Sequence, residues 1–192
     1  MTQVYVLDIS SLEVDFYKKR MPTNFLSEAK KYKDSEQFKR SFFSWYLLAD
    51  ILKDSGFAVE NIKIEYNEYK KPRINNLFFN ISHSLNVVVL VLSNEDVGVD
   101  IEYIAKKDND KLARRILNDV ELERYLKNKD YFYKIWTKKE AEIKRLGLGA
   151  TIKLLKEISA DADTYKIKDK EQNRYFVSIS PKGSKINHLK SI

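Results

Sequence analysis

Two short motifs combine acidic and basic side chains at spacings that could bring them together. Asp100 and Glu102 lie two residues apart in a β-branched run, so on a strand both carboxylates leave the same face. Glu140 and Lys144 lie four residues apart in a run of helix-forming residues, so they share one face of a helix. Three carboxylates and a lysine brought together would hold a hard divalent cation beside a phosphate, which indicates phosphoryl chemistry.

Each motif alone also has a simpler explanation. An Asp-x-Glu pair is common on the exposed face of a strand, and a Glu-Lys pair on a solvated helix adds only about 0.2–0.5 kcal/mol to its stability. Gly98 precedes the acidic pair and allows the close approach of another backbone or a ligand. Trp136 lies on the same stripe as Glu140 and Lys144, where it is expected at the rim of a site. The two motifs together are far more specific than either one.

Other candidate residues precede these motifs. His83 lies in a polar segment, residues 82–86, that we place between two strands; it could donate to a phosphate oxygen beside Ser82, or cap a turn as a structural histidine. Basic residues gather in three groups, each of which could bind phosphate or be solvated surface: Lys30, Lys31 and Lys33; Lys39 and Arg40; Lys70, Lys71 and Arg73.

Composition limits the class of protein. The 192 residues are 43% hydrophobic and 33% charged, which is typical of one large or two small globular domains. The absence of cysteine excludes disulfides, a thiolate nucleophile and a Cys-ligated zinc site. No apolar run reaches membrane length and no signal peptide is visible, so we expect a cytoplasmic protein without a membrane partner.

The net charge of +7 indicates an anionic partner, but a nucleic acid, an anionic cofactor, an acidic protein and simple surface lysines all remain open on charge alone. Aromatic residues are not interleaved with the basic groups as a single-strand nucleic-acid platform would require.

Periodicity predicts the elements that must position these residues. Strands are expected at 4–7, 62–66, 78–81, 87–92, 97–101, 165–168 and 174–180, and helices at 35–53, 111–117, 119–127 and 130–146. Gly56 is expected to cap the first helix, and Gly147 with Gly149 to end the last. The order predicts an α+β chain of two lobes, 1–96 and 97–192, which divide at the turn over residues 93–96.

The combination resembles the motifs of 4′-phosphopantetheinyl transferases of the larger, pseudo-dimeric type represented by the surfactin-synthetase activator. The matching segments agree in order and spacing and span roughly residues 30–149: Lys71-Pro72, Phe79-Asn80-Ile81-Ser82-His83-Ser84, Val97-Gly98-Val99-Asp100-Ile101-Glu102, and Trp136 to Lys144. Trp136 with Lys139-Glu140-Ala141 is similar to the Trp/Lys-Glu-Ala subgroup of that family.

The resemblance implies transfer of the phosphopantetheine arm of coenzyme A to a serine of an acidic apo carrier protein, with release of adenosine 3′,5′-bisphosphate. By this resemblance Asp100, Glu102 and Glu140 hold Mg²⁺ (or Mn²⁺), and Glu140 takes the serine proton directly or through water. Lys144 stabilises charge on the transferring phosphate or the leaving group, and His83 contacts a coenzyme A phosphate.

Further matches concern the grip on coenzyme A and the assembly. Lys71 and Ser82 match family positions at the cofactor, while Lys30 and Arg40 match less closely the residues that grip its 3′-phosphate. We expect the N-terminal lobe to grip coenzyme A, the C-terminal lobe to carry the metal and catalytic residues, and a monomer to complete one site without nucleic acid. Leu148 stands where the family often has lysine, and the tail after residue 150 carries no matching motif.

Two other classes remain. Asp100 followed by Glu142 and Lys144 fits the loose Asp…Glu-x-Lys pattern of metal-dependent nucleases, although residues i and i+2 diverge on the helix expected there. A non-enzymatic module that binds acidic proteins or nucleic acid would use the positive charge, but it leaves the three carboxylates unexplained.

Overall fold

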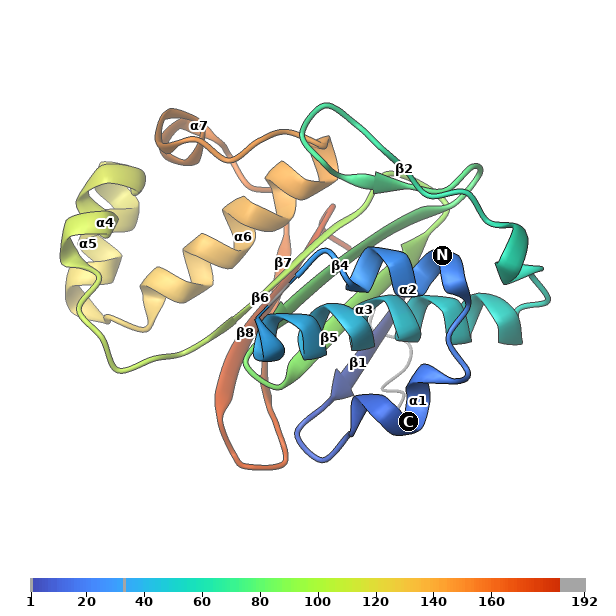
Figure 1. The fold of residues 1–192 in the computed structure, drawn as a ribbon. Coiled ribbons are helices and arrows are strands. Elements are labelled where there is room, and N and C mark those ends of the chain that lie inside the picture. The colour runs from blue at the N-terminus through green and yellow to red at the C-terminus, as the bar shows by residue number, and fades with distance from the viewer. Residues whose placement is uncertain (1, 33, 184–192) are drawn as a thin grey trace.

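Two three-stranded antiparallel sheets form the centre of the molecule (Figure 1). The computed structural model describes residues 2–32 and 34–183. The first sheet has the order β1-β5-β4, formed by β1 (Gln3–Asp8), β5 (Val87–Ser93) and β4 (Phe78–Ser84). The second has the order β6-β8-β7, formed by β6 (Gly98–Tyr103), β8 (Arg174–Ser180) and β7 (Asp163–Lys168).

Helix α3 (Ser35–Asp54) packs against the first sheet because it buries a broad apolar surface. The Asp34 side chain accepts a hydrogen bond from the Gln37 N–H (2.8 Å) and begins the helix, and Gly56, at φ 86°, follows its end as predicted. Two short helices, α1 (Val14–Lys18) and α2 (Thr23–Ala29), lie beside it. Their side chains join those of α3, β4 and β5 in one core.

Helix α6 (Tyr131–Leu146) packs across β6 and β8 and ends at Gly147, which adopts φ 69°. The alternation along β6 separates two environments. Val99 and Ile101 are buried in a core that the two sheets share with Val89 and Val91 of β5. Asp100 and Glu102, which alternate with these two residues, leave β6 on the other face, toward α6.

Shorter elements surround these layers. The segment between α3 and β4 contains η1 (Val59–Asn61) and the small hairpin of β2 (Glu65–Tyr66) and β3 (Pro72–Arg73). Helices α4 (Asp110–Ile116) and α5 (Asp119–Lys127) precede α6, and α7 (Ile152–Glu157) follows it. A capping box formed by Asn118 and Glu121 begins α5.

The mixed α+β class is confirmed, and two local expectations were wrong. The strand expected over 62–66 is reduced to the two residues of β2, because Ile62 and Ile64 pack against the α3 core outside regular pairing. Ser82, His83 and Ser84 belong to β4 rather than to a turn, because each pairs with β5. Helices α1, α2 and α7 were not predicted. Among the described residues, no helix is both long enough and apolar enough to cross a membrane.

Candidate active site

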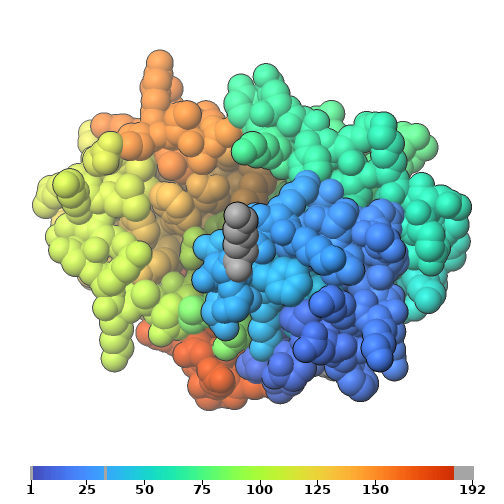
Figure 2. Space-filling model, in the orientation of Figure 1, coloured from blue at the N-terminus to red at the C-terminus, as the bar shows by residue number. Residues whose placement is uncertain are grey.

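A polar cavity of about 360 Å³ lies where β4, β6 and α6 meet. In the view of Figure 2 the surface is hollowed between the blue segment that contains α3 and the orange segment of α6. Most of the predicted site residues line this cavity, together with Ile81 and Ile101: Ser82, His83, Asp100, Glu102, Trp136, Glu140 and Lys144. The structure therefore brings together side chains that are up to 62 residues apart in sequence.

Gly98 explains how α6 comes close enough to β6 to form the cavity. A Cβ atom placed on Gly98 would lie 2.0 Å from the carbonyl oxygen of Ala141 and 2.5 Å from the backbone nitrogen of Arg145. Only a glycine permits this approach. Of the two roles predicted for Gly98, the structure therefore shows the approach of another backbone.

Lys144 joins the two motifs. Its ammonium group forms an ion pair with Asp100 Oδ1 (2.6 Å) and donates to Ser82 Oγ (3.1 Å). Ser82 in turn donates to Asp100 Oδ1 (2.9 Å). The other oxygen, Asp100 Oδ2, is buried and has no hydrogen-bond partner among the described residues. Such an oxygen is destabilising unless a donor or a cation meets it, so the cavity presents an unsatisfied acceptor.

The two other carboxylates carry perturbed acidities. Burial, followed by the negative charge of Asp100, raises the pKa of Glu102 to about 7, although Lys144 and a hydrogen bond from the Trp136 indole oppose the rise. Burial and then Asp100 also raise the pKa of Glu140. Three acids around one cavity thus repel one another, with the single ammonium group of Lys144 between them. Trp136 stacks on Phe132 and is half-buried at the edge of the cavity, as expected.

His83 lies on β4, beside this acidic group, and faces cations. Desolvation by the neighbouring groups, followed by the positive charges of Arg40 and Lys144, lowers the pKa of His83 to about 4, although part of the side chain is exposed to solvent. The imidazole is therefore neutral at pH 7. Arg40 comes from α3, where it also pairs with Glu36 (3.8 Å). Arg40 and Lys144 create a positive region around His83, next to the carboxylates.

The carboxylates fit a divalent cation in chemistry, but they are not preassembled around one. Within the described residues, no three acidic or histidine side chains converge closely enough to hold a metal ion. A bound Mg²⁺ would give the Asp100 oxygen a partner. It would also offset the burial and the mutual repulsion that raise the pKa of Glu102 and Glu140. Lys144 serves as the counter-ion of Asp100 in this structure.

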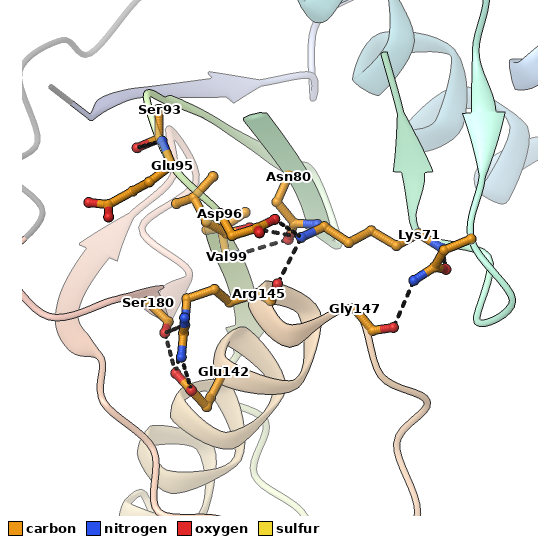
Figure 3. A network of polar contacts seen from close by, with 12 residues as sticks. Lys71, Asn80, Ser93, Glu95, Asp96, Val99, Glu142, Arg145, Gly147 and Ser180 are labelled. Carbon is orange, nitrogen blue, oxygen red and sulfur yellow. Dashed lines mark hydrogen bonds and ion pairs between the residues drawn. The ribbon is translucent and has the colours of Figure 1, made fainter. Parts of the chain in front are cut away.

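Two predicted cofactor residues lie elsewhere. The Lys71 ammonium donates to the carbonyl oxygens of Arg145 (3.0 Å) and Val97 (3.4 Å) and lies 3.6 Å from Asp96 (Figure 3). It thereby joins the end of α6 to the start of β6, and burial lowers its pKa. Lys71 lines a separate cavity of about 640 Å³ along β3 and the start of β4. Lys30 is exposed at the end of α2 and does not line the carboxylate cavity.

Glu142 does not join Asp100 and Lys144. It is buried, accepts a hydrogen bond from Ser180 and pairs with Arg145 at the opposite side of α6 (Figure 3). The nuclease pattern of Asp, Glu and Lys is therefore not assembled. Sequence reasoning missed the contacts of Asn80 and Ser84, which reach the backbone of β6. The signal was the alternation of polar residues at positions 80, 82 and 84.

An acidic cavity with the cationic groups of Lys144 and Arg40 beside it can accommodate a divalent metal ion and a phosphate. The sequence profile of the 4′-phosphopantetheinyl transferase superfamily matches residues 96–188, a range that contains the second sheet and α6. Together with the curated relatives, this match supports assigning the chain to the 4′-phosphopantetheinyl transferase superfamily.

Three curated relatives illustrate the similarity. The chain is 40% identical over 99 residues to 4′-phosphopantetheinyl transferase gsp of Aneurinibacillus migulanus, which covers 48% of this chain and 41% of the relative. It is 32% identical over 145 residues to 4′-phosphopantetheinyl transferase Sfp of Bacillus subtilis (strain 168), covering 68% and 64%. It is 29% identical over 170 residues to 4′-phosphopantetheinyl transferase ffp of Bacillus subtilis, covering 81% and 72%. The first two matches each span less than two thirds of the relative's length.

Proposed function

We propose that this chain transfers the 4′-phosphopantetheine arm of coenzyme A to a serine hydroxyl of an apo acyl or peptidyl carrier protein and releases adenosine 3′,5′-bisphosphate. The observation that supports the proposal is the single cavity in which Asp100, Glu102 and Glu140 meet Lys144 and His83. Family membership supports it independently.

Each side chain has a role that its position suits. Asp100, Glu102 and Glu140 would hold Mg²⁺ or Mn²⁺, which supplies charge neutralisation at the diphosphate. Glu140, whose pKa is raised, would take the proton from the carrier serine. Lys144 would leave Asp100 to stabilise negative charge on the phosphate in the transition state. Neutral His83 would donate to a coenzyme A phosphate.

The remaining residues support binding. Ser82 hydrogen-bonds to both Asp100 and Lys144, so it would fix them when coenzyme A binds. Arg40 is close enough to His83 to lower its pKa and would attract the 3′-phosphate. Lys30 and Lys71 lie outside the carboxylate cavity, and their contact with coenzyme A is part of the proposal that the family resemblance alone supports.

The same proposal covers organisation and partners. Residues 1–96 and 97–192 would be two similar lobes of a pseudo-dimeric fold, each with a three-stranded sheet and a long helix, dividing between β5 and β6. The carrier would be acidic, which suits the net charge of +7, and would serve fatty-acid or secondary-metabolite synthesis. A cytoplasmic monomer stays a prediction.

The direct test is incubation with coenzyme A, Mg²⁺ and a panel of apo carrier proteins, followed by intact-mass measurement. We expect one phosphopantetheine group on at least one carrier, and its loss with chelator or in Asp100→Asn. The matched control is Asp163→Asn, which changes an aspartate in β7 of the same sheet, outside the cavity. Failure of every carrier to gain mass, together with no binding of coenzyme A, would refute the proposal.

A further inference from the structure

Three polar side chains of β4 hydrogen-bond to the backbone of β6. Asn80 Oδ1 accepts from the Val99 N–H (2.9 Å), Ser82 Oγ from the Ile101 N–H (3.4 Å) and Ser84 Oγ from the Tyr103 N–H (3.0 Å). The partners differ by 19 residues each time, so the two strands run in the same direction. Figure 3 shows the Asn80–Val99 bond. We call these three residues the β4 clamp.

The clamp occupies a free sheet edge. Both β4 and β6 are the edge strands of their sheets. An antiparallel edge strand leaves every second backbone N–H without a partner in the ladder. The N–H groups of Val99, Ile101 and Tyr103 are buried or half-buried, and side-chain oxygens of β4 replace the carbonyl groups that a further strand would supply.

The clamp also reaches the acidic side chains. Ser82 donates to Asp100 Oδ1 (2.9 Å), and Ser84 Oγ lies 3.5 Å from Glu102 Oε2, to which it donates. Each serine thus contacts a backbone N–H and the carboxylate one residue earlier on β6. Asn80 repeats the backbone contact, and the corresponding earlier residue is Gly98, which has no side chain.

We propose that Asn80 and Ser84 are positioning residues that set the register and the carboxylates of β6 from the neighbouring sheet. Neither lines the cavity, so each acts through β6. A one-residue slip of β6 would turn both acidic side chains toward the valine core. The clamp therefore couples the strand that bears His83 to the strand that bears Asp100 and Glu102. Its expected effect on metal binding rests on the proposed function.

The test compares Asn80→Ala, Ser84→Ala and the double variant with the wild type by two measurements. Amide hydrogen exchange should speed up at least about tenfold at Val99 in the first variant and at Tyr103 in the second. The dissociation constant of Mn²⁺, measured by titration with coenzyme A present, should rise about three- to tenfold in each single variant, as expected for losing one hydrogen bond. Ser84→Thr keeps the hydroxyl and should restore both values.

Two controls separate positioning from general destabilisation. In Asn24→Ala the lost amide donates to the Val59 and Ile62 carbonyls, which do not line the cavity. In Thr151→Ala the lost hydroxyl accepts from the Leu154 N–H at the start of α7, also outside the cavity. Neither should change the Mn²⁺ constant.

Unchanged Mn²⁺ affinity in the double variant would overturn the positioning role, and unchanged exchange at Val99 and Tyr103 would overturn the clamp itself. Mn²⁺ binding by a wild-type protein that labels no carrier would refute the proposed function alone.

Discussion

Glu102 should make the metal-free protein less stable as pH rises. Its pKa is raised from 4.5 to about 7, so the folded state disfavours the carboxylate relative to the unfolded chain. The penalty is absent well below pH 4.5, grows between pH 4.5 and 7, and is complete above pH 7. At about 1.36 kcal/mol for each tenfold change in the acid dissociation constant, this rise corresponds to about 3 kcal/mol. The value is an upper bound because Glu102 is only half-buried.

Glu102→Gln removes this penalty while it keeps an oxygen that can accept the Trp136 N–H. In chelator at pH 8.5, the free energy of unfolding of the variant should exceed that of the wild type by up to about 3 kcal/mol, and at pH 5 by less than about 1 kcal/mol. Urea unfolding followed by tryptophan fluorescence at several pH values measures the difference. In a thermal scan the same gain is roughly 6–12 °C at pH 8.5.

Mg²⁺ provides the complementary arm of this experiment. At pH 8.5 it should stabilise the wild type and have much less effect on Glu102→Gln, because the variant lacks one of the ligands. The control is Glu68→Gln at an exposed position, which should stay within about 0.5 kcal/mol of the wild type at every pH. A Glu102→Gln difference that is independent of pH, or a variant less stable than the wild type at pH 8.5 in chelator, would refute the reasoning.

Three further outcomes are expected. Gly98→Ala should lower the free energy of unfolding by about 3 kcal/mol or more, because its Cβ would overlap the Ala141 carbonyl oxygen. A melting temperature within about 2 °C of the wild type, which corresponds to roughly 1 kcal/mol, would contradict this expectation. Lys139→Met should lower the free energy of unfolding in urea by about 3–5 kcal/mol, since the buried ammonium group donates to two backbone carbonyls and to a glutamate. The control Lys138→Met, at the half-buried neighbouring position, should lower it by less than about 1 kcal/mol. Equal losses in the two variants would show that the contacts of Lys139 do not stabilise the fold. In the ligand-free protein, NMR should show His83 titrating near pH 4. Because folding disfavours its protonation, His83 should reduce the stability of the folded state as pH falls below 6.5. A titration midpoint above pH 6 would contradict the desolvation and the positive charges inferred around the ring.

Much of the secondary structure was predictable because long periodic segments carry their own signal. The helix of residues 35–53 and the helix of 130–146 appear within a residue or two of their expected limits, as α3 and α6. The short helices α1, α2 and α7 were missed because five to seven residues contain too few apolar repeats to show a period. The segment around Ile62 and Ile64 alternates like a strand, yet tertiary packing against α3 decides its path.

The candidate site divides in a similar way. The spacing of Asp100 and Glu102, and of Glu140 and Lys144, sufficed to predict which side chains share a face, because strand and helix geometry depend only on sequence separation. The displacement of Lys71 to the end of α6 could not be predicted in this way. Nor could the separation of Glu142, which pairs with Arg145 and Ser180.

The sequence by itself determined the residue types of the site, their faces and the superfamily, since these follow from local periodicity and from motifs in a set order. Only the tertiary structure decided which faces meet. The approach of α6 to β6 at Gly98, the pairing of Lys144 with Asp100 and the clamp between β4 and β6 all join residues that are distant in the chain. The chemical state of the site also depends on the tertiary structure. The raised pKa of Glu102 and the unpartnered oxygen of Asp100 result from burial and from neighbouring charges, and both exist only after the two sheets have packed.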